Sequence, residues 1–306
     1  MPGAYAHLTL VSQIDSPNAL AGLGGLSKQD LGQLLLYSKF FELGAVSPDY
    51  PYLSIISSTA KAWADAMHYQ RTGDRLKAGI RFVNTLSGPE KYKSLAWLLG
   101  FASHIIADVT VHPIVELKVG PYAGNEKAHR TCEMNQDVFI YNLLGVGNLH
   151  SNNFLRDGIA ACNDPAHPDR LDATICAVWG HMLQTTDSQL FHDSPPSFHT
   201  WHKWFKDLLA VAAPGQLFPW SRHMALGDGY LYPAKPDDAY IKRLQTPKGG
   251  PLSYLEIFDK AQANAREYWA IIVRACLAGD ESGLPRIKNW NLDTGKDETG
   301  ALTFWG

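Results

Sequence analysis

The side chains best suited to chemistry are imidazoles and carboxylates within the first 133 residues: His7, Asp49, His68, His104, Asp108, His112, His129 and Glu133. Imidazole combined with carboxylate is the donor set that most often selects zinc. The donors are numerous enough for a cluster of three divalent ions. Such a cluster activates water and stabilises charge on a phosphate, so the pattern favours phosphodiester hydrolysis.

Three pairs of a His and an acidic residue four positions apart are informative only if they lie on helices. A His followed four residues later by Asp or Glu is expected about once by chance. This chain has three: His104 with Asp108, His112 with Glu116, and His129 with Glu133. Residues four apart share one helix face and can bind one ion. His104 and Asp108 lie in the apolar stretch 94–111, where burial is costly unless they bind a metal or hydrogen-bond each other.

The order and spacing of these residues resemble the zinc-dependent phospholipase C and S1/P1 nuclease superfamily. The resemblance covers about residues 2–145 and implies a largely helical fold with three zinc ions in a cleft. The implied ligands are Pro2 and His7 for one ion; Asp49, His68 and His104 for a second, with Asp108 bridging these two; and His112, His129 and Glu133 for the third. Tyr50 matches a residue that helps line the choline pocket in the bacterial phospholipase C branch.

The beginning of the chain departs from this family. Relatives expose a Trp by cleaving a precursor segment, whereas this chain begins Met1-Pro2-Gly3. Removal of Met1, expected before a small residue, would let Pro2 supply its amine; the alternative is a frayed end. No secretory signal or membrane span is apparent. We therefore expect a cytoplasmic protein, or an effector exported by a route that reads no N-terminal signal.

Composition limits the remaining possibilities. A chain of 306 residues with 45% hydrophobic content can bury one large core. We expect residues 1–146 to form a zinc-binding catalytic core and residues 147–306 to complete the same domain and its cleft. The net charge is −3 and no block of Lys or Arg is present, so no dedicated nucleic-acid-binding patch is predicted. Four cysteines without close pairing indicate reduced thiols.

Apolar periodicity predicts an all-α fold, a multi-helix bundle of the phospholipase C/P1 nuclease type with a mixed, loop-rich C-terminal elaboration. The predicted helices span 28–44, 58–70, a segment after Ser87 that bears His104, 125–144, 171–190, 198–209 and 254–278. Ser27 should cap the first, and Ser87 with Glu90 should form a capping box. Two prolines flanking Asp49 predict a loop there.

The second half of the chain has weaker patterns. Residues 147–169 and 225–253 are predicted to be loop or irregular connection. The aromatic stripe in 198–209 should face the core, although such a helix could also lie in a membrane interface. The tail 279–306 should pack back over the domain because its aromatic residues, Trp290, Phe304 and Trp305, require burial. The histidines beyond residue 145 are not assigned to zinc.

The resemblance implies hydrolysis by a hydroxide held between two zinc ions, with Asp108 bridging them and Asp49 orienting the water. A phospholipase C that releases a phosphorylated head group, with peripheral membrane contact, is favoured by Tyr50, the aromatic helix and the lack of a basic face. The first alternative is a single-strand nuclease or nucleotide phosphodiesterase of the S1/P1 type, in which aromatic rings hold a base: Tyr52, Trp63 or Tyr122. The second is a non-catalytic, zinc-stabilised binding protein. No protein partner is indicated.

Overall fold

The computed structural model describes residues 3–54, 57–142, 158–211 and 232–306. Helices dominate these residues, and the β-structure is limited to two short antiparallel ladders and one isolated bridge. The predicted all-α class is therefore confirmed. The prediction that residues 1–146 and 147–306 form core and completion of one domain stays a prediction.

Up to residue 142, the described residues form eight α-helices and one 3₁₀ helix: α1 (Ala4–Ile14), α2 (Pro17–Ala21), α3 (Lys28–Leu35), α4 (Ser38–Val46), η1 (Ser47–Leu53), α5 (Ser58–Tyr69), α6 (Thr72–Asn84), α7 (Gly88–Val119) and α8 (Glu126–Tyr141). The described elements that follow are β1 (Asn163–Asp164), β2 (His167–Leu171), α10 (Ala173–Thr186), α11 (Ser188–Asp193), α12 (Phe198–Val211), η4 (Asp238–Tyr240), β3 (Leu244–Gln245), β4 (Pro251–Leu252), α13 (Tyr254–Val273), η5 (Arg274–Ala278) and η6 (Leu284–Arg286).

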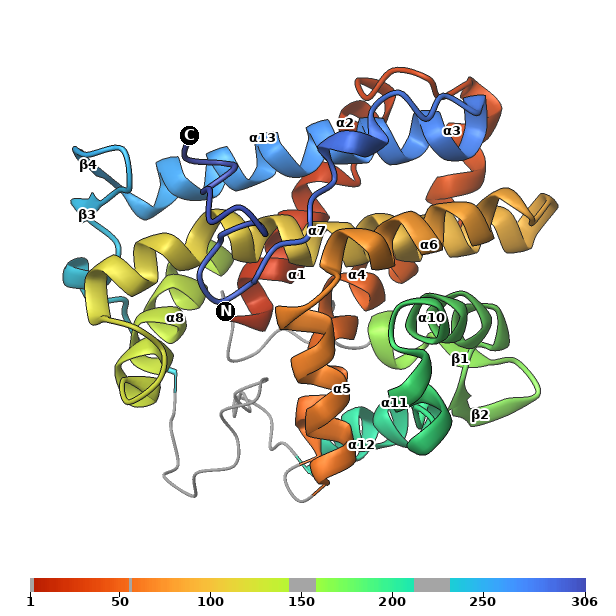
Figure 1. Cartoon of the computed structure of the whole chain (residues 1–306), viewed down its shortest axis with the longest axis horizontal. Coiled ribbons are helices and arrows are strands. Elements are labelled where there is room, and N and C mark those ends of the chain that lie inside the picture. Colours follow the sequence, from red (N-terminus) through yellow and green to blue (C-terminus); the bar gives the residue numbers. More distant parts are fainter. Residues whose placement is uncertain (1–2, 55–56, 143–157, 212–231) are drawn as a thin grey trace.

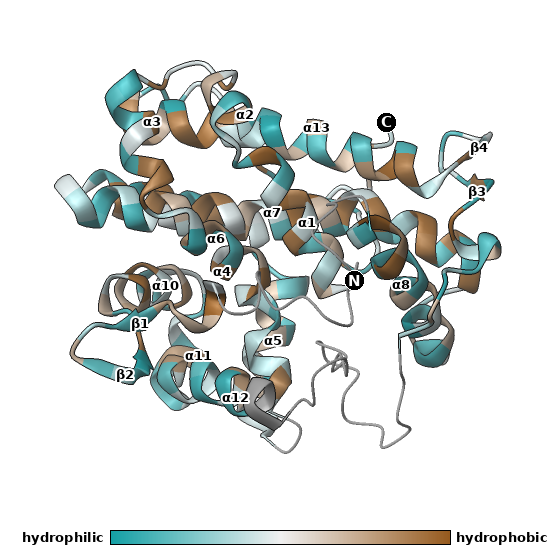
Figure 2. Cartoon of the chain, turned by 180° about the vertical axis from the view of Figure 1, so that it is seen from behind, coloured by the Kyte–Doolittle hydropathy of each residue, from teal (hydrophilic) through white to brown (hydrophobic). Residues whose placement is uncertain are grey.

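Helix α7 is the centre of the fold. Residues 94–115 are all buried, and α4, α6, α8, α10 and α13 pack around them (Figure 1). A helix that is apolar on all sides must be enclosed, and the apolar colouring of α7 beneath more polar outer helices follows this rule (Figure 2). By length and composition α7 alone among the described helices could cross a membrane, but its most apolar window is completely buried by protein.

Two glycines bring α4 and α7 into backbone contact. A Cβ on Gly44 would lie 2.1 Å from the carbonyl oxygen of Trp97, and one on Gly100 would lie 2.0 Å from that of Phe41. Only glycine permits this approach. The close crossing brings the backbone at the C-terminal end of α4 against the middle of α7, where His104 lies.

Several predicted elements differ from the structure in the first half. The predicted helix 28–44 breaks between α3 and α4; its start is correct, because Ser27 and Asp30 form a capping box. Ser87 precedes α7 but makes no side-chain cap, so the predicted capping box there is wrong. The segment around Asp49 is a 3₁₀ helix rather than a loop, since Pro48 is tolerated in the first turn of a helix. The predicted helix at 58–70 is confirmed as α5.

The second half follows the predictions more loosely. The predicted helix 171–190 divides into α10 and α11, and residues 163–171 form a small hairpin instead of loop. Helix α12 buries Trp201 and Phe205, which confirms the core orientation of its aromatic stripe. Of the two predicted irregular segments, residues 147–157 and 225–231 lie outside the described part.

The C-terminal tail returns over the helices, as predicted. After α13 the chain turns back and crosses α7 near the N-terminal end of α1, which the deep blue trace in Figure 1 shows. Trp290, Phe304 and Trp305 are all buried, and the indole of Trp305 donates a hydrogen bond to the carbonyl oxygen of Thr110 on α7 (2.9 Å).

Candidate metal centre

Five of the predicted ligands converge from four elements at the middle of α7. His7 comes from α1, Asp49 from η1, His68 from α5, and His104 and Asp108 from successive turns of α7. Two overlapping groups have ligand atoms that all lie within 4.8 Å of one another: His7, His104 and Asp108, and Asp49, His68 and His104. All five side chains are buried. We call these five residues the α7 cluster.

The contacts within the α7 cluster have the spacing of ligands around a shared ion. His7 Nε2 lies 3.2 Å from Asp108 Oδ1, and His104 Nε2 lies 3.3 Å from Asp108 Oδ2. His68 Nε2 lies 3.4 Å from Asp49 Oδ1 and 3.3 Å from His104 Nε2. When both imidazoles carry their proton on Nδ1, the two Nε2 lone pairs face each other, and a cation between them makes the contact favourable.

Backbone carbonyls orient two of these imidazoles. His68 Nδ1 lies 2.7 Å from the carbonyl oxygen of Ala64, one turn earlier in α5. His104 Nδ1 lies 2.8 Å from the carbonyl oxygen of Ala45 in α4. Each carbonyl requires a proton on Nδ1, which leaves the Nε2 lone pair facing the cluster. This is the usual arrangement around a zinc-binding histidine.

Asp108 is the residue that can serve two ions. His104 belongs to both groups, but its Nδ1 is occupied by Ala45, and a single imidazole nitrogen binds one ion. The two oxygens of Asp108 instead face different histidines, His7 and His104. Both oxygens are buried without an aligned hydrogen bond, as are Oδ1 of Asp49 and both ring nitrogens of His7. Such unsatisfied groups are costly unless a cation binds them, so these residues fit a metal.

The electrostatics of the α7 cluster also favour a cation. Burial alone would raise the pKa of Asp108, but its contacts with the imidazoles of His104 and His7 outweigh burial and hold this pKa well below its usual range. The pKa of Asp49 is likewise lowered, because His68 and His104 outweigh the effect of burial. Burial, followed by the proximity of His104, lowers the pKa of His7 and favours its neutral form. The cluster thus presents ionised carboxylates and a neutral imidazole, the forms that bind zinc.

The remaining predicted ligands lie further along α7 and on α8. His112, His129 and Glu133 are buried, and His129 and Glu133 are one helical turn apart. His129 Nε2 lies 2.7 Å from the carbonyl oxygen of Gly120, while its Nδ1 is buried without a hydrogen bond. Burial lowers the pKa of His129. Across the described residues, these three side chains do not form a group with all ligand atoms within 4.8 Å. We call them the α8 group; their shared ion stays a prediction, and Pro2 lies outside the described residues.

The sequence matches a family model described as zinc dependent phospholipase C over residues 6–213, well over half of the chain. The chain belongs to the zinc-dependent phospholipase C family. A search of curated proteins and a search of solved structures gave no match. The matched range includes the α7 cluster and the α8 group, and of the predicted ligands Pro2 alone precedes it.

Membership of this family explains the donor chemistry described above. The family is one of zinc-dependent hydrolases, and zinc fits the histidine and carboxylate donors of the α7 cluster. The suspected resemblance is thereby confirmed at the level of the family.

Tyr50, the predicted substrate residue, has a fully buried side chain. Its hydroxyl lies 3.3 Å from Nδ1 of His202, and its ring stacks on Phe205 at a centroid distance of 5.5 Å. Burial raises the pKa of Tyr50 well above its usual value, so it is a neutral phenol. Its role as a head-group contact stays a prediction, and in this conformation the ring supports α12.

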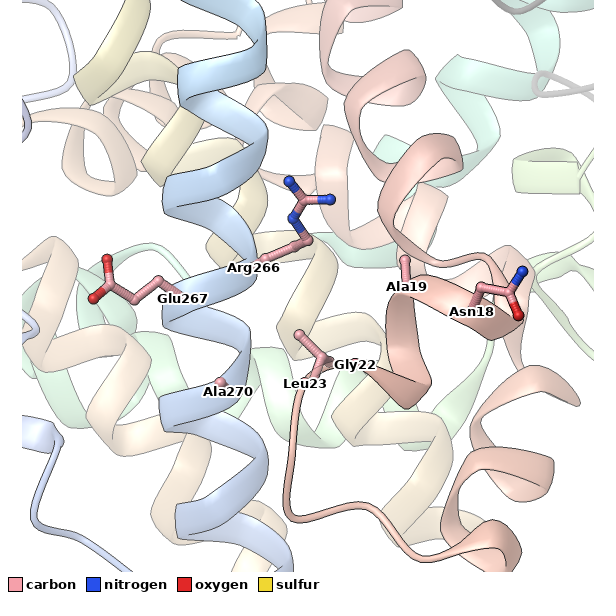
Figure 3. A pocket seen from close by; sticks show the side chains of 7 residues that line it. All are labelled: Asn18, Ala19, Gly22, Leu23, Arg266, Glu267 and Ala270. Atoms are coloured by element: carbon pink, nitrogen blue, oxygen red, sulfur yellow. The ribbon is translucent and has the colours of Figure 1, made fainter.

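A surface groove elsewhere on the molecule has different properties. It lies between α2 and α13, has a volume of about 480 Å³, and is lined by residues that include Asn18, Arg266 and Glu267. Figure 3 shows Arg266 extending toward α2, whereas Glu267 points to the other side of α13. None of the predicted ligands lines this groove, so it is separate from the metal centre.

Sequence reasoning missed the groups that orient the ligands. The carbonyls of Ala45 and Ala64 act through the backbone, so residue type gives no signal for them. It also missed Asp137, a buried carboxylate of α8 whose Oδ1 accepts a hydrogen bond from the amide of Ala6 (2.8 Å) next to His7. The His, Asp and Glu pattern could not identify Asp137, because it pairs with a distant amide.

Proposed function

We propose that the chain is a zinc-dependent phospholipase C that hydrolyses a phospholipid and releases its phosphorylated head group. The observation that carries this proposal is the α7 cluster, which lies within the family match and brings together buried donors that suit a cation. Asp108 would hold two zinc ions together with the other residues of the α7 cluster, and the α8 group would hold a third. Bound zinc lowers the pKa of a coordinated water and neutralises charge on a phosphoryl group.

The side chains of the cluster have separate tasks in this reaction. Asp108, with one oxygen toward His7 and one toward His104, keeps the two sides of the cluster at a fixed separation. Asp49 is ionised and faces the cluster with a buried oxygen that lacks a hydrogen bond. That oxygen can accept a proton from water and orient it toward phosphorus. Ala45 and Ala64 hold the imidazoles in place, so little reorganisation accompanies the reaction.

A second candidate function is hydrolysis of single-stranded nucleic acid or a nucleotide diester by the same residues. The observation that favours it is aromatic: Tyr52 packs against His68 at a centroid distance of 5.4 Å, and Tyr122 packs against His129 at 5.3 Å. Rings beside the ligands could stack on a base. The net charge of −3 without a basic segment favours the lipid instead.

The deciding experiment is head-group release from phosphatidylcholine vesicles by zinc-loaded, tag-free protein. We expect release of phosphocholine that a chelator abolishes and added zinc restores. The matched pair of variants is Asp108→Asn, in the cluster, and Asp172→Asn, a buried carboxylate paired with Lys93 at 2.6 Å. Only the first should lose activity. Hydrolysis of single-stranded nucleic acid without head-group release would show that the second candidate function is the correct one. Retention of zinc with no hydrolysis of either substrate would refute the proposal that the protein is an enzyme.

A further inference from the structure

A short loop of the C-terminal tail contacts ligands of both predicted metal sites. Residues 290–296 form a closed turn in which the amide of Asn291 donates to the carbonyl of Lys296 (2.8 Å) and that of Gly295 donates to the carbonyl of Asn291 (2.9 Å). The side-chain oxygen of Asn291 accepts from the amides of Asp293 (3.0 Å) and Thr294 (3.1 Å). We call residues 290–296 the tail loop. Its internal hydrogen bonds give it a defined shape.

The peptide groups of Leu292 lie between two predicted zinc ligands. The amide of Leu292 donates to the carbonyl oxygen of His68 (2.9 Å), and the carbonyl oxygen of Leu292 accepts from Nδ1 of His112. Leu292 itself is buried. Because Nδ1 of His112 donates to this carbonyl, its Nε2 is the nitrogen left to bind a metal. The carbonyl of Leu292 thus does for His112 what the carbonyl of Ala45 does for His104.

The tail loop is fitted to α7 at the turn after His112. Pro113 has no amide hydrogen, so the carbonyl of Val109 has no partner from the helix at that position. Gly295 packs against α7 at this position: a Cβ on Gly295 would be 2.5 Å from Cγ of Pro113 and 2.7 Å from the carbonyl oxygen of Val109. Gly295 also has a φ of +69°, which disfavours other residues. A side chain at this position must therefore move the loop away from α7.

Hydrogen bonds at its first residue, Trp290, fix the loop further. Thr72 Oγ1, at the start of α6, accepts from the amide of Trp290 (2.7 Å) and donates to its carbonyl oxygen (2.9 Å). These hydrogen bonds hold the tail loop against Thr72, which lies four residues after His68. Its position relative to both His68 and His112 is set by packing rather than by sequence proximity.

Asp293, at the tip of the tail loop, adds a carboxylate beside the α8 group. Its Oδ1 lies 4.0 Å from Nδ1 of His112, and its charge also acts on His129. A carboxylate next to a ligating imidazole strengthens the ligand and favours a cation nearby. The family match ends at residue 213, so the tail loop lies outside the region that the family model covers.

We propose that the tail loop is a positioning element of the third zinc site. The Leu292 carbonyl fixes the orientation of the His112 ring, and the Asp293 carboxylate, beside that ring, adds a negative charge that favours a bound cation. This inference rests on the proposed third ion at the α8 group. Asp293 is a positioning residue, because it acts through His112 and His129 rather than on the substrate.

The test is zinc binding by the full-length protein, measured as bound zinc per chain during titration against chelators of graded strength. The variants are Asp293→Asn, which removes charge at constant shape, and Gly295→Ala, which moves the loop. Gly300→Ala is the matched control, since Gly300 has a similar φ of +84° in the same tail but open space at its Cβ position. Circular dichroism of each variant checks that the fold is retained.

We expect wild type and Gly300→Ala to bind three ions. Asp293→Asn and Gly295→Ala should keep two at unchanged affinity and bind the third about ten- to a hundred-fold more weakly. Three ions of unchanged affinity in both variants would overturn the role of the tail loop and leave the proposed function intact. Two ions in the wild type would remove the third site itself. Equal losses in Gly295→Ala and Gly300→Ala would overturn the role of the Gly295 contact with α7.

Discussion

The α7 cluster and the α8 group use the same residue types but are built differently. In the α7 cluster, α1, η1 and α5 bring side chains onto a fully enclosed helix, and every ligand atom has another within 3.4 Å. The α8 group lies where α7 ends, and its ligands do not converge to the same degree within the described residues. Its orientation relies on a tail loop 180 residues away from His112 in sequence.

This difference separates a metal site that is formed before the ion binds from one that the ion must help to order. The α7 cluster is held by the protein core, so its geometry exists before a metal binds. The ligand atoms of the α8 group converge less closely, so metal binding must supply more of its order. We therefore expect the two regions to differ in zinc affinity, with the ion at the α8 group the first to leave under a chelator.

The largest expected effect comes from Asp108→Asn. Both oxygens of Asp108 face histidines, so the change weakens the site on both sides of the cluster and should lower head-group release at least about a hundred-fold. Bound zinc, measured by mass spectrometry of the purified protein, should fall by two ions while the α8 ion stays. Loss of a single ion would show that Asp108 does not bridge.

A smaller effect is expected from His112→Ala. This variant should lose the ion of the α8 group only, and head-group release should fall about ten-fold or more. The measurement is zinc content together with the rate of release at saturating lipid. His181→Ala is the control, because His181 is a half-buried histidine of α10 whose ring packs on Phe82 and which is not one of the predicted ligands. A loss of all zinc in His112→Ala would contradict the claim that the α7 cluster and the α8 group bind their ions independently.

Gly44→Ala tests how the core preorganises the α7 cluster. The new methyl group would collide with the backbone of Trp97 and separate α4 from α7, at a cost of about 1–3 kcal/mol in the free energy of unfolding. The carbonyl of Ala45 would move with α4, so zinc affinity of the α7 cluster should also fall. Gly32→Ala, in exposed helix α3 with open space around it, should instead stabilise by about 0.5–1 kcal/mol. Chemical denaturation and zinc titration check both variants.

The last prediction concerns the pH dependence of stability and Asp137, whose carboxylate links α8 to the helix that carries His7. Burial raises the pKa of Asp137 to about 7 in the folded protein. The unfolded chain releases this proton at lower pH, so the contribution of Asp137 to stability declines as pH rises from about 4 to 7 and is constant above. Asp137→Asn, compared with wild type in the metal-free state, should gain relative stability by up to about 4 kcal/mol across this window. An equal pH dependence of unfolding in both proteins would show that Asp137 is ionised throughout.

The sequence was sufficient for the parts of the molecule that depend on local pattern. The apolar run of α7 predicts its helix, and the four-residue spacing of His104 and Asp108 predicts one shared face. The matching order of the ligands predicts the family, which the family model confirms. The tail required burial because of its tryptophans, and the structure buries them.

What the sequence could not give are contacts made by backbone and by shape. The break between α3 and α4 follows from packing on α7, which overrides a continuous apolar stripe. The carbonyls of Ala45 and Leu292 orient histidines far away in sequence, and no side-chain pattern marks them. The close contact between Gly295 and α7 at Pro113 can be recognised only once the tail loop and α7 are both placed in the structure.

The central claim is that the α7 cluster holds two zinc ions that share Asp108. Anomalous scattering from crystals of the zinc-loaded protein, recorded on both sides of the zinc absorption edge, tests it most directly. The account predicts two zinc peaks about 3.5–4 Å apart, with one oxygen of Asp108 directed at each. A single peak, or two peaks with Asp108 bound to only one of them, would contradict it.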